Sequence, residues 1–197
     1  MNALAIFDLD DTLIDTQGLL LRPALETVAG VVGVPVDALN AAGKSIDEVL
    51  APFLDSIPID KRAAAARAWY DPHVPPLPTL PGARSMLSEL QGRIHLALLT
   101  RGDPERQGNK IRSCGLAEFF EAIRIRPIEE PGTKRDDIAE LMSLFAVPAG
   151  RTVVIGDDEL DELAHARALG CEAWLVPDVP LTGMAGLLDR RGWLASA

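Results

Sequence analysis

The sequence predicts an α/β protein of three layers, with a parallel sheet between helices and a small all-helical segment inserted after the first strand. Short apolar runs alternate with helical segments along most of the chain, and this alternation favours parallel strands joined by right-handed crossovers. Several of the runs are continuously apolar, as expected of parallel strands buried on both faces. Residues 16–77 alone contain helical patterns without a strand.

Five apolar runs are interpreted as strands, and helical segments are expected between them. The strands are expected at residues 3–7, 94–100, 122–126, 152–156 and 172–177. The helices are expected within residues 82–91, 104–116, 134–147 and 158–170. Pro104 and Gly115 favour a helix between them, because proline is common in the first turn of a helix and glycine just after its end.

The inserted segment is expected to form a separate cap. Its helical patterns lie at residues 19–33, 45–57 and 60–70, and a proline-rich, extended stretch at 73–82 returns the chain to the sheet. The predicted domains are a core made of residues 1–15 and 78–197 and a helical cap made of residues 16–77.

The composition excludes several classes of protein. The chain has 197 residues, 48% hydrophobic and 24% charged, which is typical of a folded globular protein. Its net charge is −10 and no stripe of lysine and arginine occurs, so neither nucleic acid nor a membrane surface is expected as a partner. The two cysteines, Cys114 and Cys171, are not in a metal-binding spacing. Together with the absence of a signal-peptide pattern, they predict a cytoplasmic protein.

Polar residues gather where the predicted strands end. They are Asp8, Asp10 and Asp11 after the first strand, Thr100, Arg101 and Asp103 at the second, and Asp157, Asp158 and Asp161 after the fourth; Lys134 opens the preceding helix. The carboxyl ends of parallel strands share one edge of a sheet, where ligands bind. Two like charges about 4 Å apart repel by roughly 4 kcal/mol at an effective dielectric constant of 20. The acids must therefore face water or surround a cation.

Structural interpretations of these residues remain open at this point. Asp11 or Asp157 could cap a helix, and Asp161 would then share a helix face with Asp157. Thr100 could simply finish a strand. Lys134 could be a surface residue, although a cation in the first turn of a helix opposes the helix dipole. A second acidic cluster at another strand end favours the functional interpretation.

The motifs resemble those of the haloacid dehalogenase (HAD) superfamily of aspartate-nucleophile phosphohydrolases. "FDLDDTL" is similar to the first motif, "LLTRG" to the second, Lys134 to the third and "VVIGDDELD" to the fourth. The insertion resembles the helical cap of the phosphoglycolate phosphatase-like and β-phosphoglucomutase-like branch. This resemblance implies a Rossmann-like core.

The resemblance also implies a role for each motif residue. Asp8 would be the nucleophile and Asp10 the general acid and base. Thr100, Arg101 and Lys134 would bind the phosphoryl group. The implied cofactor is Mg²⁺, held by Asp8, Asp157 and the backbone carbonyl of Asp10, with Asp161 close by.

The expected function is Mg²⁺-dependent hydrolysis of a small phosphate monoester through an aspartyl-phosphate. The resemblance also implies phosphoryl transfer over dehalogenation, because the dehalogenases of the superfamily do not keep an acid at the position of Asp10. A phosphosugar mutase and a non-catalytic phosphometabolite-binding protein are the alternatives. The expected partner is a small phosphorylated metabolite, and the sequence predicts no oligomeric state. Arg22, Lys44 and Trp69 of the insertion could reach the substrate, or could be surface or packing residues.

Overall fold

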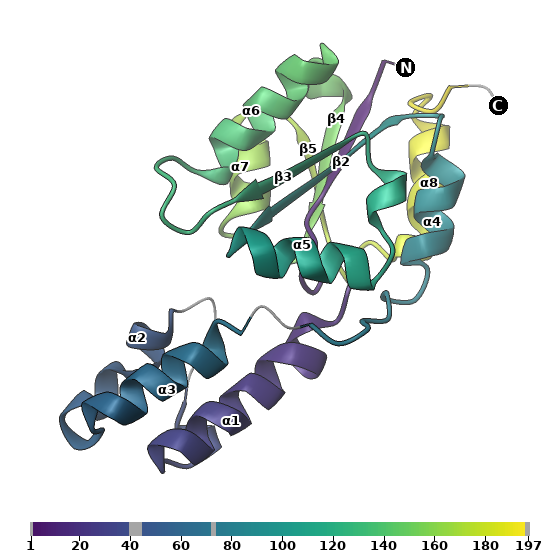
Figure 1. The fold of residues 1–197 in the computed structure, drawn as a ribbon. Coiled ribbons are helices and arrows are strands. Elements are labelled where there is room, and N and C mark those ends of the chain that lie inside the picture. Colours follow the sequence, from purple (N-terminus) through teal and green to yellow (C-terminus); the bar gives the residue numbers. More distant parts are fainter. Residues whose placement is uncertain (1, 40–44, 72–73, 196–197) are drawn as a thin grey trace. The chain divides into compact units, whose positions relative to one another are not determined.

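The computed structural model describes residues 2–39, 45–71 and 74–195. The chain divides into two compact units (Figure 1). The core unit consists of Met1–Asp15 and Pro75–Ala197, and the insertion unit consists of Thr16–Val74.

The described residues of the core unit contain one five-stranded sheet with the strand order β3-β2-β1-β4-β5. Every neighbouring pair of strands is parallel. The strands are β1 (Leu4–Phe7), β2 (His95–Arg101), β3 (Ala122–Arg126), β4 (Thr152–Gly156) and β5 (Glu172–Leu175). The predicted α/β class and the parallel sheet are therefore confirmed.

Helices cover both faces of this sheet. They are α4 (Ala83–Leu90), α5 (Pro104–Ser113), α6 (Lys134–Phe145), α7 (Glu162–Ala168) and α8 (Leu181–Arg190). Figure 1 shows α6 and α7 on one side of the sheet and α4 and α8 on the other. The three predicted layers are present, while α8 was not among the predicted helices.

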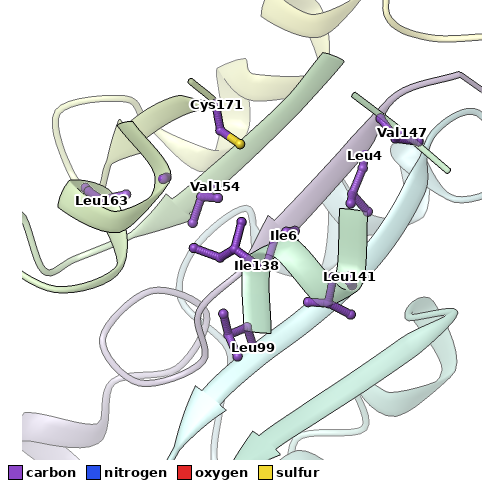
Figure 2. Packing of buried hydrophobic residues seen from close by; sticks show 11 residues of the cluster. Leu4, Ile6, Leu99, Ile138, Leu141, Val147, Val154, Leu163 and Cys171 are labelled. Atoms are coloured by element: carbon purple, nitrogen blue, oxygen red, sulfur yellow. The ribbon is translucent and has the colours of Figure 1, made fainter. Parts of the chain in front are cut away.

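The layer formed by α6 and α7 is joined to the sheet by a hydrophobic cluster (Figure 2). Leu4 and Ile6 of β1 and Val154 of β4 belong to it, together with Ile138 and Leu141 of α6. All five side chains are buried, and full burial of such a side chain contributes about 1.5–3 kcal/mol. This packing stabilises the strands and therefore the starting points of the loops at their carboxyl ends.

The insertion unit has a small core of its own. It contains α1 (Arg22–Val32), α2 (Ile46–Leu50) and α3 (Ile59–Trp69); a π-helical turn over Gln17–Leu21 precedes α1, and a 3-10 helix over Ala51–Ser56 follows α2. Buried side chains from each helix, including Val28, Leu50 and Trp69, form its hydrophobic cluster. Its described residues contain no strand. The use of this unit as a cap over the site stays a prediction.

The chain enters and leaves the insertion through two paired segments of the core unit. Ile14 forms an antiparallel bridge with Thr79, and the Leu80 N–H donates a hydrogen bond to the Leu13 carbonyl at 2.8 Å. The core unit resumes at Pro75, slightly before the predicted boundary at residue 78. The two ends of the insertion are therefore tied together within the core.

None of the helices in the described part of the chain combines the length and apolar character needed to cross a membrane.

Candidate active site

The strand order places the candidate site beside β1. From β1 the chain proceeds to β2 and β3, and it then returns to β4 on the opposite side of β1. Ligands of open parallel sheets bind at such a reversal, beyond the carboxyl ends of the strands. Asp8 directly follows β1, Thr100 lies at the end of β2 and Asp157 directly follows β4. The Asp8 N–H donates to the Ile155 carbonyl at 2.9 Å, which anchors Asp8 at this edge.

Lys134 places a positive charge at this edge of the sheet. Its Nζ lies 3.1 Å from Asp8 Oδ1, 2.6 Å from Glu162 Oε2 and 3.4 Å from Asp161 Oδ2. Burial acts to lower the pKa of Lys134, but the Asp8 and Glu162 carboxylates outweigh it and raise the pKa above its ordinary value. The ammonium group therefore stays charged, and Lys134 is not a surface residue.

The start of α6 is fixed by two sets of contacts that place Lys134. Thr133 and Asp136 form a capping box, in which the Thr133 N–H donates to Asp136 Oδ2 at 2.7 Å. Asp137, fully buried, accepts hydrogen bonds from Arg124 and Arg126 of β3. Removing either arginine would leave the buried Asp137 charge less well compensated, so these contacts hold the first turn of α6 against β3.

The carboxylates at β1 and β4 are crowded. Burial raises the pKa of Asp8 to about 8, with Glu162 and Asp10 adding to the effect and Lys134 opposing it. Burial, Glu162 and Asp11 raise the pKa of Asp157 to about 6. Both shifts have the same origin, which is negative charge held in a poorly hydrated place.

Asp10 is held separately, by two residues of α5. Lys110 Nζ donates to Asp10 Oδ1 at 2.8 Å, and Gln107 Nε2 donates to Asp10 Oδ2 at 2.8 Å. Gln107 Nε2 also lies 2.6 Å from Thr100 Oγ1. Asp8 and Asp10 thus contact different lysines, although they are only two positions apart in the sequence.

Sequence reasoning missed Gln107 and Lys110, although a signal was present. They share the i, i+3, i+4, i+7 face of α5 with Ile111 and Cys114, and all four side chains are buried. Polar residues on an otherwise apolar helix face require buried partners.

Glu162 was also missed. Its Oε1 accepts a hydrogen bond from the Asp158 N–H at 2.9 Å, while Oε2 accepts from Lys134. It packs so tightly against Gly156 that a Cβ at that position would collide with the carboxyl group. The glycine of "VVIGDDELD" is therefore required by the approach of Glu162.

The two helix-capping interpretations are also wrong. Asp157 does not cap a helix, because α7 begins at Glu162 with Asp161 at the N-cap position. Asp157 and Asp161 therefore do not share a helix face. Asp11 does not cap a helix either: its φ is 54°, it lies in the turn after β1, and Thr16 precedes the next helical segment.

The remaining candidates lie around this edge in different roles. Asp158 Oδ1 accepts the N–H groups of Leu160 and Asp161 at 2.8 and 3.1 Å, so Asp158 shapes the turn before α7. Asp161, by contrast, contacts Lys134. Asp103 caps α5 by accepting the Arg106 N–H at 2.8 Å. Arg101 is exposed and donates to the Ile128 carbonyl at 3.3 Å.

The candidate residues of the insertion unit have local partners. Arg22 forms exposed ion pairs with Glu26 at 3.0 Å and with Asp37 at 3.4 Å. Trp69 is buried in the hydrophobic cluster of the unit. Lys44 lies outside the described residues.

The donor set at β1 and β4 fits a divalent cation by its charge. Four carboxylates, from Asp8, Asp157, Asp161 and Glu162, lie near the ammonium group of Lys134. Within residues 2–39, 45–71 and 74–195, no three His, Cys, Asp or Glu side chains are already arranged around a common metal position. The predicted ligand set of Asp8, Asp10, Asp157 and Asp161 stays a prediction.

A parallel sheet with acidic clusters and a buried lysine at its reversal point is typical of α/β enzymes, whose ligands bind at the carboxyl edge of the sheet. The family model described as "Haloacid dehalogenase-like hydrolase" matches residues 5–176, and the chain belongs to this family. The predicted family is thereby confirmed, and the protein is a hydrolase by family.

Two curated relatives and one solved structure are similar to the chain. Glyceraldehyde 3-phosphate phosphatase from Pyrococcus furiosus is 26% identical over 185 residues, covering 83% of this chain and 76% of the relative. N-acylneuraminate-9-phosphatase from Mus musculus is 26% identical over 208 aligned residues, covering 89% and 84%. The HAD hydrolase YfnB from Bacillus subtilis, described as bound to magnesium and as showing interdomain movement, superposes with a TM-score of 0.63 at 20% identity, covering 90% and 88%.

Proposed function

We propose that the protein is a Mg²⁺-dependent phosphatase that hydrolyses a small phosphate monoester through an aspartyl-phosphate on Asp8. The observation that carries this proposal is that two acids of the cluster after β1, Asp8 and Asp10, contact different lysines. Asp8 contacts Lys134 at 3.1 Å, whereas Asp10 contacts Lys110 at 2.8 Å. Two carboxylates in distinct environments suit two distinct roles. The two relatives named as phosphatases support the same class of reaction.

In the first step, one Asp8 carboxylate oxygen attacks phosphorus while the bond between phosphorus and the ester oxygen breaks. Asp10, in its protonated form, donates its proton to the departing oxygen, which leaves as an alcohol. The products are the free alcohol and an acyl phosphate on Asp8, so one difficult displacement becomes two easier ones.

In the second step, Asp10 acts as a base. Its carboxylate takes a proton from water while the water oxygen attacks phosphorus. The bond between phosphorus and Asp8 breaks, which releases inorganic phosphate and restores the Asp8 carboxylate. The proton that Asp10 gave in the first step is thereby returned.

Thr100, Arg101 and Lys134 are the proposed phosphoryl-binding groups. Thr100 and Lys134 are almost fully buried, at 1% and 7% exposure. A hydroxyl donor and an ammonium group in a poorly hydrated site stabilise developing negative charge more strongly than they would in water.

Asp8, Asp157 and the Asp10 carbonyl would hold Mg²⁺, with Asp161 close by. When bound, the ion would offset the crowded carboxylates and polarise a phosphoryl oxygen. The raised pKa values of Asp8 and Asp157 support this assignment, because the acids lack sufficient positive charge among the side chains around them.

The insertion unit is proposed to act as a cap that sets substrate size. A cap suits a small phosphorylated metabolite that fits into a closed site. The names of the two relatives point to different phosphate esters, so the shared chemistry is the phosphate monoester. A cytoplasmic location belongs to the same proposal and is supported by the two free, buried cysteines.

A substrate screen separates this function from its alternatives. Phosphorylated metabolites are incubated with the protein and Mg²⁺, and kcat/KM is ranked by release of inorganic phosphate. A mutase would convert a sugar phosphate to its isomer without stoichiometric phosphate release. A non-catalytic protein would bind a phosphosugar without turnover.

The sharpest test uses Asp10→Asn and two leaving groups. An alkoxide leaves poorly without a proton, so hydrolysis of an alkyl phosphate should slow by about 10²–10⁴-fold. Nitrophenolate leaves readily as an anion. With 4-nitrophenyl phosphate the variant should therefore give a burst of about one equivalent followed by slow turnover, as phospho-Asp8 accumulates.

Mass spectrometry of the quenched variant should find one added phosphoryl group on the peptide that contains Asp8. Saturation with Mg²⁺ is checked first, because the variant could bind the metal more weakly. Equal slowing with both substrates, together with no phosphoenzyme at saturating Mg²⁺, would show that Asp10 is not the acid and base.

A further inference from the structure

Helix α5 carries two polar side chains that are almost completely buried. Gln107 is 2% exposed and Lys110 is 6% exposed. Burial of an ammonium group is costly unless a carboxylate compensates for it. Both residues point to the same place, because each donates to the carboxylate of Asp10, about 100 positions earlier in the chain.

The two donors bind the two different oxygens of Asp10. Lys110 Nζ lies 2.8 Å from Oδ1, and Gln107 Nε2 lies 2.8 Å from Oδ2. One donor on each oxygen fixes the plane of the carboxyl group as well as its position. A proton donor must be held within hydrogen-bond reach of the oxygen that it serves.

Gln107 also connects Asp10 to Thr100. Its Nε2 lies 2.6 Å from Thr100 Oγ1 and 3.3 Å from the Arg101 carbonyl. The Asp10 carboxylate and the Arg101 carbonyl only accept hydrogen bonds, so the amide nitrogen must face them. Thr100 then accepts from Gln107, which leaves its own hydroxyl hydrogen available for a different acceptor.

The backbone of the β2–α5 turn accommodates this arrangement. A Cβ at Gly102 would lie 3.0 Å from Gln107 Cγ, which is tighter than ordinary van der Waals contact. The absence of a side chain at Gly102 thus lets Gln107 lie across the turn, between Thr100 and Asp10.

We propose that Gln107 and Lys110 are positioning residues, which hold the Asp10 carboxylate and the Thr100 hydroxyl in fixed orientation toward the same phosphoryl group. The inference rests on the proposed role of Asp10 as acid and base. Lys110 acts through Asp10 alone, whereas Gln107 acts through both Asp10 and Thr100.

The test for Lys110 compares two aryl phosphates of similar size. Phenyl phosphate has the more basic leaving group and depends more on a proton donor than 4-nitrophenyl phosphate does. Lys110→Met should lower kcat/KM for phenyl phosphate by about 10–100-fold, the usual effect of removing an orienting partner. The loss with 4-nitrophenyl phosphate should be clearly smaller.

A double-mutant cycle shows whether Lys110 acts through Asp10. In the Asp10→Asn background, Lys110→Met should add little further loss with phenyl phosphate, because the group that it positions is already disabled. Arg112→Met is the matched control, since Arg112 is an exposed basic residue of the same helix. It should leave both reactions unchanged.

Gln107→Leu tests the second contact with a side chain of similar size. It should show the same dependence on leaving group and should also weaken competitive inhibition by inorganic phosphate. Lys110→Met should leave this inhibition near the wild-type value. If Lys110→Met does not fold, Gln107→Leu alone carries both measurements.

The possible failures are distinguishable. If Asp10→Asn depends on the leaving group but Lys110→Met and Gln107→Leu slow both esters equally, the positioning role is overturned and the proposed function stands. Additive losses in the cycle overturn it as well. If Asp10→Asn itself shows no such dependence, the proposed acid–base role fails first, and the inference falls with it.

Discussion

Burial and Lys134 act in opposite directions on the pKa of Asp8, and their balance determines how the charge of Asp8 affects stability. Burial raises its pKa from 3.8 to about 8, although Lys134 opposes the shift. The folded state therefore holds the Asp8 proton more tightly than the unfolded chain does. As pH rises through this interval, the unfolded chain loses the proton first, so the contribution of Asp8 to the free energy of unfolding falls.

We expect Asp8→Asn to keep the fold and to remove turnover, because an amide cannot form the acyl phosphate. In EDTA, the free energy of unfolding of the variant should equal or exceed that of the wild type, and the difference should grow between pH 3.8 and about 8. Urea unfolding at a series of pH values measures this difference. Turnover near the wild-type rate would refute the nucleophile, and a difference independent of pH would contradict the raised pKa.

At the scale of residues, the sequence could identify the groups that end strands. Asp8, Thr100 and Asp157 are visible because each follows a buried apolar run. Their partners were not visible in the same way. Glu162 pairs with Lys134 across 28 positions, and Lys110 pairs with Asp10 across 100. Local periodicity contains no information on which distant side chain compensates a buried charge.

At the scale of elements, strand positions were predictable and the start of α7 was not. Burial on both faces leaves a continuous apolar run, and β3 and β4 have the predicted bounds. Before α7, Asp158 turns the chain by accepting two backbone N–H groups. A side chain that bonds to nearby backbone competes with helix formation, which delays the helix to Glu162.

A substitution of Gly156, at the end of β4, tests the segment that joins β4 to α7. Gly156→Ala should destabilise the fold by about 1–3 kcal/mol, as overpacking usually does. It should also lower kcat/KM by roughly 10–10²-fold, because displacing Glu162 moves Lys134. Thermal unfolding and steady-state kinetics measure the two effects.

Gly183→Ala is the control for this substitution. Gly183 lies in α8, where a Cβ would meet no atom within 4 Å. Alanine there should stabilise the protein by up to about 1 kcal/mol through helix propensity. A Gly156→Ala variant with unchanged stability and activity would show that Glu162 does not need its present position.

At the scale of the whole molecule, the metal should link activity to stability. EDTA should abolish hydrolysis and Mg²⁺ should restore it, while Ca²⁺ should substitute poorly because its coordination is larger and less regular. Mg²⁺ should also raise the melting temperature, and less so in Asp157→Asn. Full activity after exhaustive metal removal would disprove the metal assignment.

The two units give a second prediction at this scale. Deleting residues 16–74, with a short linker from Asp15 to Pro75, should leave a folded core, because this choice keeps the bridge between Ile14 and Thr79. Discrimination among substrates should fall more than hydrolysis of 4-nitrophenyl phosphate does. Circular dichroism and kcat/KM ranking test this. A deletion variant that is unfolded under all conditions would show that the segment belongs to the core.

The bridge between Ile14 and Thr79 also has a consequence for how such proteins can diversify. Because the core itself brings the two ends of the insertion together, the entropy of closing that loop depends only weakly on the length of what lies between them. Segments of different size and sequence could therefore be exchanged at this point without changing the candidate site at the carboxyl edge of the sheet. Under the proposed cap role, such a junction would let the choice of substrate evolve at a different pace from the chemistry.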